Sequence, residues 1–218
     1  MNTFKLKDPG SAITHFIGMV IAILAIAPLL IKASHGVNRG HLGAFAIFIL
    51  SMVALYAAST IYHTFNISDK INTLLRKIDH AMIFVMISGS YTPVCLIALP
   101  KNIGIPLLIT VWTITIIGTL FKIFWITCPR WVSSAMYIGM GWLSVVAISS
   151  IIKNLPFSAF AWLLVGGIIY TIGGIIYAMK LPIFKKVNWK NFGNHELFHC
   201  FVMLGSICHF VMVYNYLA

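Results

Sequence analysis

Residues 157–179, FSAFAWLLVGGIIYTIGGIIYAM, contain no charged side chain. An α-helix of that length rises about 34 Å, which is enough to cross the hydrocarbon core of a bilayer of about 30 Å. A continuous apolar run of this length is typical of a membrane-spanning helix, because lipid offers no hydrogen-bond partners to the backbone. The run therefore predicts an integral membrane protein.

Six further apolar runs of about 20 residues occur along the chain. They lie at 12–31, 42–63, 80–99, 103–121, 132–152 and 195–217. Together the seven runs use roughly 140 positions, so only short loops remain and no extramembrane domain fits. The runs are too long and too continuously apolar for the strands of a barrel. We therefore predict one all-α domain over residues 1–218, a bundle of seven transmembrane helices.

The composition agrees with this prediction. Of the 218 residues, 60% are hydrophobic and 9% are charged, whereas soluble domains carry about a quarter charged residues. This balance excludes a cytosolic enzyme, a disordered chain and a disulfide-stapled secreted module. We expect the four cysteines to be free thiols.

The net charge of +11 comes from basic residues in short clusters between the apolar runs. No basic stripe or nucleic-acid-binding motif accompanies them, so membrane topology and lipid headgroups explain the charge better than a nucleic acid partner.

These cations are divided unequally between the two sides of the predicted bundle. One side carries four: Lys32, Arg39, Lys101 and Lys153. The N-terminus and the loops after the second, fourth and sixth spans carry eleven: Lys5, Lys7, Lys70, Arg76, Lys77, Lys122, Arg130, Lys180, Lys185, Lys186 and Lys190. Because cytoplasmic loops are enriched in Lys and Arg, we expect a cell-membrane protein with its N-terminus in the cytoplasm and its C-terminus outside.

Ionisable residues inside the spans mark the candidate site, since each costs at least about 2 kcal/mol on insertion scales. His195 and His199 stand one helical turn apart on one face, the geometry that two imidazoles need to hold one metal ion. The predicted topology brings His63, at the end of the second span, to the same membrane edge. Three imidazoles with an open fourth position are typical of a catalytic zinc site. We therefore predict that His63, His195 and His199 bind Zn²⁺.

Asp79 is expected to open the third span at that edge, together with His80. Because neutral imidazoles leave the charge of the ion uncompensated, we predict that Asp79 orients the water or a ligand histidine, while a direct bond to the metal stays open. Ser59, one turn before His63, is predicted to bond the water or a developing oxyanion. Ser59 and Asp79 are thus the candidate catalytic residues. His15 lies at the same level and either donates a further hydrogen bond or faces the headgroups.

Residues 195–199 read His-Glu-Leu-Phe-His, which matches the H-E-x-x-H string of zinc proteases with Glu196 as the general base. An intramembrane metalloprotease is therefore an alternative. The match is short, however, and neither a second protease motif nor a soluble domain accompanies it.

Five motifs occur together along the chain: Ser-Thr-Ile-Tyr-His at 59–63, Ile-Asp-His at 78–80, Gly-Ser-Tyr-Thr-Pro at 89–93, Met-Gly-Trp at 140–142 and His-Glu-Leu-Phe-His at 195–199. In this combination the whole chain resembles the hemolysin III family, of the progestin and adipoQ receptor (PAQR) group within a superfamily that includes alkaline ceramidases.

The resemblance implies an N-in, C-out bundle with zinc held by His63, His195 and His199, and with the functional Ser and Asp of the family falling on Ser59 and Asp79. It also implies that Glu196 is incidental. The chain departs from the family before the first helix, where Asp-Pro-Gly-Ser at 8–11 replaces the acidic pair and Asn that relatives often carry. The resemblance therefore assigns no role to this entry segment.

The first functional hypothesis is a zinc-dependent, ceramidase-like hydrolase of amide or ester bonds in membrane lipids, with zinc polarising the carbonyl. The second is a pore-forming, cytolytic hemolysin, although an apolar seven-span protein lacks the soluble-to-membrane transition of secreted pore formers. The third is a sensor or receptor whose zinc is structural and whose cavity binds a lipid ligand.

Overall fold

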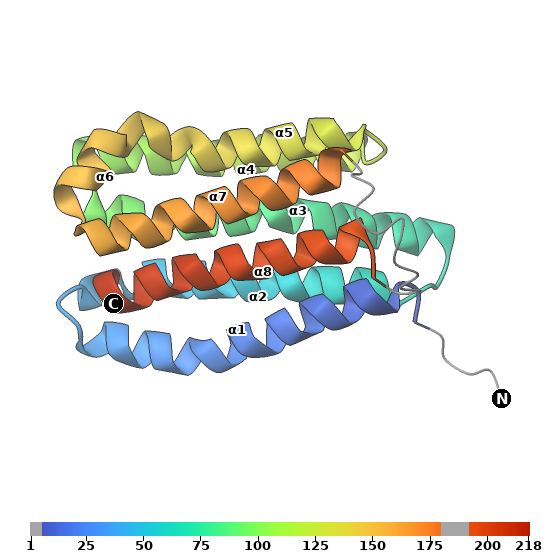
Figure 1. Cartoon of the computed structure of the whole chain (residues 1–218), viewed down its shortest axis with the longest axis horizontal. Helices are drawn as coiled ribbons and strands as arrows, with labels where there is room; N and C mark the ends of the chain where they lie inside the picture. The colour runs from blue at the N-terminus through green and yellow to red at the C-terminus, as the bar shows by residue number, and fades with distance from the viewer. Residues whose placement is uncertain (1–5, 180–191) are drawn as a thin grey trace.

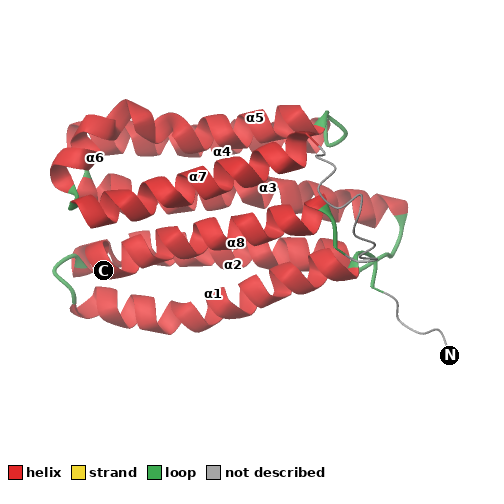
Figure 2. Cartoon of the chain, viewed as in Figure 1, coloured by secondary structure: helices red, strands yellow, loops and turns green. Residues whose placement is uncertain are grey.

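The computed structural model describes residues 6–179 and 192–218, and every regular element in them is helical (Figure 2). Within these residues seven spans are long and apolar enough to cross a membrane. They are built from α1 (Pro9–His35), α2 (Leu42–Thr64), α3 (Asp69–Pro93), α4 (Lys101–Phe124), α5 (Arg130–Gly141) followed by α6 (Ile148–Asn154), α7 (Phe157–Met179) and α8 (Asn194–Met212). The predicted fold class is confirmed.

The third helix starts earlier than the sequence analysis expects. The apolar run begins at residue 80, but α3 begins at Asp69 because Ser68 caps it: the Ser68 hydroxyl accepts a hydrogen bond from the amide of Ile71 at 3.3 Å. The polar first turns extend beyond the neighbouring helices (Figure 1). Asp79 therefore lies well inside α3, and the prediction that it opens the helix is wrong.

The long helices form a closed ring in the order α1, α2, α3, α4, α5, α7 and α8, with α8 packing back against α1 (Figure 1). The spans of α3, α2 and α8 are the most buried of the seven. The other helices turn large apolar side chains outward, among them Leu24, Ile116 and Ile168. A surface of this kind suits lipid and would be unstable in water.

Tyr91 forms hydrogen bonds that connect two irregular helical regions. α3 continues as a π-helical turn at Val94–Ala98, and a 3-10 segment at Trp142–Ala147 separates α5 from α6. The Tyr91 hydroxyl donates to the carbonyl of Gly141 at 2.6 Å and accepts from the amide of Ser144 at 2.8 Å. Backbone groups freed by a break inside a membrane need internal partners, so Tyr91 stabilises the broken fifth span.

The position of Lys122 differs from the prediction, which puts this residue in the loop after the fourth span. It lies in the last turn of α4 and is fully buried, with its ammonium donating to Cys128 Sγ at 3.1 Å and also bonded to the hydroxyl of Ser133. Five other cations of the same side lie outside the described residues: Lys5, Lys180, Lys185, Lys186 and Lys190. The orientation of the bundle stays a prediction from the charge distribution.

The expectation of free thiols is confirmed. All four cysteines are unpaired: Cys95, Cys128, Cys200 and Cys208.

Candidate metal centre

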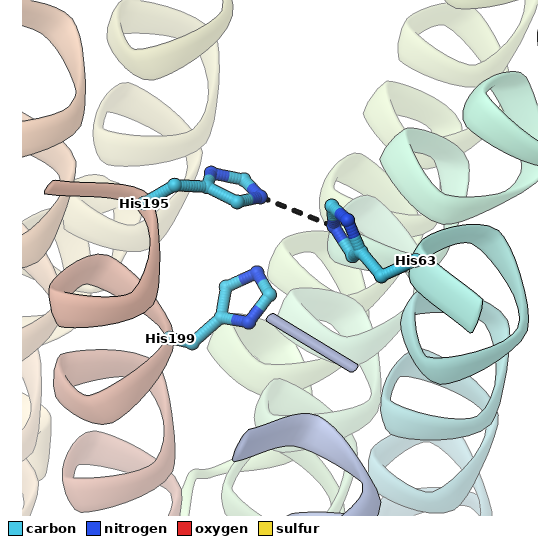
Figure 3. Close-up of side chains that lie close together, drawn as sticks. All are labelled: His63, His195 and His199. Carbon is cyan, nitrogen blue, oxygen red and sulfur yellow. Dashed lines mark hydrogen bonds between the residues drawn. The ribbon is translucent and has the colours of Figure 1, made fainter. Parts of the chain in front are cut away.

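Three histidines meet where α2 ends and α8 begins (Figure 3). His63, His195 and His199 each contribute one ring nitrogen, and these nitrogens lie within 4.8 Å of one another. The Nε2 atoms of His63 and His195 are 3.1 Å apart, although the two residues are 132 positions apart in the chain. Two nitrogens at about 2.0–2.1 Å from one tetrahedral zinc lie about 3.3 Å apart, so the spacing of His63 and His195 fits ligands of a shared zinc ion.

The entry segment before α1 orients His63. Asp8 Oδ2 lies 2.9 Å from His63 Nδ1, and the backbone amide of Asp8 donates to the carbonyl of His63 at 2.9 Å. The amide of Lys7 donates to the carbonyl of Thr64 at 3.2 Å, which pins the segment to the end of α2. A carboxylate that accepts from Nδ1–H leaves Nε2 as the free nitrogen, as in many metal sites.

Thr14, in the second turn of α1, orients His199 in the same way. Thr14 Oγ1 donates to the carbonyl of Gly10 or Ser11, each 3.0 Å away, so its oxygen is free to accept from His199 Nδ1 at 3.1 Å. The ring of His15 stacks on that of His199, with centroids 3.5 Å apart and planes at 8°. His199 thus has a fixed ring plane, and its Nε2 is free for a ligand.

These contacts give roles to Asp8 of the entry segment and to Thr14 of α1, which the sequence analysis does not assign. Asp8 and Thr14 each hold one candidate ligand. The available signal was an acidic residue directly before an apolar run, on the same predicted membrane side as the histidine pair. Asp8 was not assigned a role because residues 8–11 differ from the family pattern.

Lys7 adds a cation beside the centre. Its ammonium donates to the carbonyl of Tyr62 at 3.2 Å and lies 3.4 Å from the centroid of the Tyr62 ring. Partial burial lowers the pKa of Lys7, and the carboxylates of Asp8 and Asp79 oppose that shift. The centre therefore combines two nearby carboxylates with one lysine.

Asp79 and Ser59 lie beside the histidines without belonging to the converging set. The cluster consists of the three imidazoles, so the alternative in which Asp79 binds the metal directly is not favoured. His63 and Ser59 are among the electrostatic neighbours of the Asp79 carboxyl, and both Asp79 and Ser59 are buried. The hydroxyl of Ser59 adjoins the Asp79 carboxyl, and both ring nitrogens of His15 have no hydrogen-bond partner within residues 6–179 and 192–218.

Glu196 turns away from the cluster. One carboxylate oxygen accepts from the amide of Gly193 at 2.8 Å, which caps α8, and the other accepts from the hydroxyl of Ser11 on α1. The residue is absent from the cavity wall next to the histidines. A general base needs access to the attacking water, so this placement does not support the protease alternative.

A cavity of about 180 Å³ extends from the cluster along the bundle. His15, Ser59 and Asp79 line its polar end. The rest of its wall is mostly apolar and comes mainly from α3, α5, α6, α7 and α8 and from the segments that follow α3 and α5, reaching Leu99 and Ile151 near the opposite end of the bundle. The shape and lining suit a hydrocarbon chain whose polar group lies at the histidines.

Glycines of the fifth and sixth spans have two different roles. A Cβ atom on Gly166 would lie 2.4 Å from His209 Cδ2, and one on Gly173 would lie 2.7 Å from Phe201 Cβ, so close helix packing needs both. Gly141 and Gly167 instead line the cavity with nothing within 4 Å of the added atom. These two glycines widen the cavity and do not bring helices together.

The sequence comparisons match the chain over most of its length. The family model of Haemolysin-III related proteins matches residues 4–210. The chain is 37% identical to Hemolysin-3 of Bacillus cereus over 99% of this chain and 94% of the relative. It is 36% identical to the Hemolysin-3 homolog of Bacillus subtilis, over 98% of this chain and 96% of the relative.

A more distant similarity extends to animal proteins. The Progestin and adipoQ receptor-like protein 1 of Caenorhabditis elegans is 26% identical over 93% of this chain, which spans 50% of that longer protein. The match to the bacterial relatives covers nearly the full length of both chains, and the family model covers all seven apolar helices in whole or in part. The chain therefore belongs to the Haemolysin-III related family.

Proposed function

We propose that this protein is a zinc-dependent, ceramidase-like hydrolase of amide or ester bonds in membrane lipids. One observation carries the proposal: three imidazole nitrogens converge beside the polar end of a mostly apolar cavity, which His195 and His199 line together with a carboxylate and a hydroxyl. When bound by His63, His195 and His199, a zinc ion supplies Lewis-acid activation of a carbonyl and of water.

The residues around the cluster have distinct roles in this proposal. Asp79 accepts the proton of the attacking water, because it is the carboxylate that lines the cavity. Ser59, which lines the cavity beside Asp79, donates a hydrogen bond to the carbonyl oxygen as negative charge develops there. His15, unpartnered among the described residues, bonds the polar group of the lipid.

The apolar wall holds the acyl chain and excludes water from the reacting bond. The wall also includes Trp142, Val145 and Leu164, which are 39%, 49% and 37% exposed on the outer surface of the bundle. These residues belong to the side formed by the fifth and sixth spans. A lipid enters there directly from the bilayer.

The charge distribution supports a site at the cytoplasmic edge of the cell membrane, and we propose that it belongs to a single domain over residues 1–218. Ligands from α2 and α8 and supporting residues from α1 and α3 all contribute to the one site. This shared construction supports treating the chain as one functional unit.

Two alternatives follow from the names of relatives. The bacterial relatives are named hemolysins, which favours a cytolytic, pore-forming activity. The animal relatives are named receptors, which favours a sensor whose zinc is structural and whose cavity binds a lipid ligand. The hydrolase is preferred because Asp79 and Ser59 line the cavity at the cluster, where a purely structural metal needs neither.

Metal analysis and lipid turnover test the proposal on protein purified into lipid nanodiscs. We expect about one zinc per chain and release of fatty acid from ceramide or phospholipid. His63→Ala should lose both, because zinc binding needs the full ligand set. His41→Ala, in the exposed turn before α2, is the matched control and should keep both.

Each other outcome favours a different function. Turnover that survives the loss of zinc in His63→Ala contradicts the hydrolase. Bound zinc and bound lipid without any cleavage support the receptor alternative. Dye release from vesicles that does not depend on His63 supports the cytolytic alternative.

A further inference from the structure

A fourth buried histidine lies deeper in the cavity. His209 follows His199 by ten residues on α8, which places it about 15 Å further along the helix axis. It lines the cavity and is 8% exposed. At that distance His209 takes no part in the metal centre. A buried imidazole in an apolar wall needs another explanation.

The hydrogen bonds of His209 define its protonation pattern. Its Nε2 lies 3.3 Å from the carbonyl oxygen of Leu163 on α7. Because a carbonyl oxygen only accepts, Nε2 carries the hydrogen and Nδ1 carries a lone pair. Nδ1 is buried and has no partner in the described part of the chain. A residue that lines the cavity thus carries a buried acceptor without a donor.

The neighbouring hydroxyl groups do not fill this need. Tyr56 Oη donates to Ser206 Oγ at 2.7 Å, and Tyr170 Oη lies 2.9 Å from the same oxygen. Ser206 Oγ in turn donates to the carbonyl of Val202 at 2.9 Å. These groups satisfy one another, so none of the three hydroxyls serves as a donor for His209.

The imidazole is held in place before any ligand binds. A Cβ atom at Gly166 would lie 2.4 Å from His209 Cδ2, so only glycine there lets the ring pack against α7. The Tyr170 ring packs edge-on against the imidazole, with centroids 5.3 Å apart and planes at 80°. A fixed ring gives the free nitrogen a fixed position, which favours one ligand geometry.

We propose that His209 forms a second polar subsite, which accepts a hydrogen bond from a hydroxyl group partway along the chain of a bound lipid. The inference rests on the proposed function for the presence of a lipid chain in the cavity, and it names the substrate class as hydroxylated lipids. A ketone or ether oxygen at this position only accepts hydrogen bonds, so it would face Nδ1 without a proton between them. The subsite therefore discriminates a hydroxyl from an oxo group.

Equilibrium binding of three fatty acids of equal length tests the subsite: a plain chain, one with a mid-chain hydroxyl and one with a mid-chain ketone. The measurement uses the full-length protein in nanodiscs with a chelator present, so that zinc chemistry does not contribute. We expect the hydroxylated chain to bind wild type up to about tenfold more tightly than the plain chain, and the ketone to bind no better than the plain chain.

Two variants assign the preference to His209. His209→Leu should bind the plain chain like wild type and lose the preference for the hydroxyl. His209→Asn places a side-chain oxygen near the position of Nδ1 and should restore part of the preference. Binding of the plain chain shows that each variant is folded.

Equal affinity of wild type for the plain and hydroxylated chains overturns the inference, and so does a preference that persists in His209→Leu. If wild type binds no chain at all, both the subsite and the proposed function fail. If wild type prefers the hydroxylated chain through His209 but cleaves no lipid after zinc is restored, only the hydrolase fails.

Discussion

The two ends of the cavity are built differently. At the polar end, Asp8 and Thr14 hold two of the three histidines by their Nδ1 atoms, so hydrogen bonds define the direction of each ring. At the apolar end, the wall has side chains such as Leu99 and Ile151 and space left by glycines. The comparison teaches that the polar end depends on the chemistry of single atoms, whereas the apolar end depends on volume.

The largest expected effect is at the polar end. Asp79→Asn removes the carboxylate that accepts a proton in the proposed reaction, so turnover should fall about 10²- to 10⁴-fold. Zinc content should stay near the wild-type level, because Asp79 is not among the converging ligands. Turnover of ceramide and zinc per chain measure the two effects. Full activity in this variant would remove Asp79 from the mechanism.

A smaller effect is expected from the residue that orients His63. Asp8→Ala removes the acceptor 2.9 Å from His63 Nδ1, so zinc affinity should fall about 10- to 100-fold. Competition with a chelator measures the affinity. The matched control is Asp69→Asn, a carboxylate exposed at the start of α3, which should bind zinc like wild type. Equal affinity in both variants would show that the contact with Asp8 does not orient the ligand.

Filling the apolar end should change which lengths of acyl chain bind and should leave zinc binding unchanged. Gly167→Leu places a side chain in the open space of the cavity, so binding of long acyl chains should weaken about tenfold, with a smaller loss for short chains. Val165→Leu, on the outward face of α7, is the control. A loss of zinc in Gly167→Leu would contradict the separation between the two ends.

The smallest effect is expected at Glu196. The H-E-x-x-H motif suggests this residue as a general base, but its carboxylate points away from the histidine cluster. Glu196→Gln keeps a side chain able to accept from the amide of Gly193, so turnover should stay within about threefold of wild type, with a stability loss of about 0.5–1 kcal/mol from the weaker cap. Thermal unfolding and turnover separate the two effects. Loss of turnover in a folded variant would restore the protease hypothesis.

Much of the candidate site follows from local sequence rules. The i, i+4 spacing of His195 and His199 places both rings on one helix face, and the alternation of spans brings His63 to the same end. The convergence of these three residues is therefore predictable without coordinates. The start of α3 was not, because its first turns are polar and an apolar run cannot reveal them.

Other parts of the site depend on contacts between segments that no sequence pattern connects. Asp8 reaches His63 because backbone hydrogen bonds pin the entry segment to the end of α2. Lys122 becomes a buried residue because Cys128 and Ser133 fold over it. Neither contact has a period or a motif, since both depend on how helix ends meet in space.

The sequence by itself determined the seven apolar helices and the three converging histidines, because the length of an apolar run and the spacing along one helix are local properties. Only the tertiary structure decided which groups orient those histidines, where Glu196 points and which acceptor in the cavity lacks a donor. The physical reason is that hydrogen bonding and burial of a side chain depend on neighbours from other helices, which meet only when the bundle has closed.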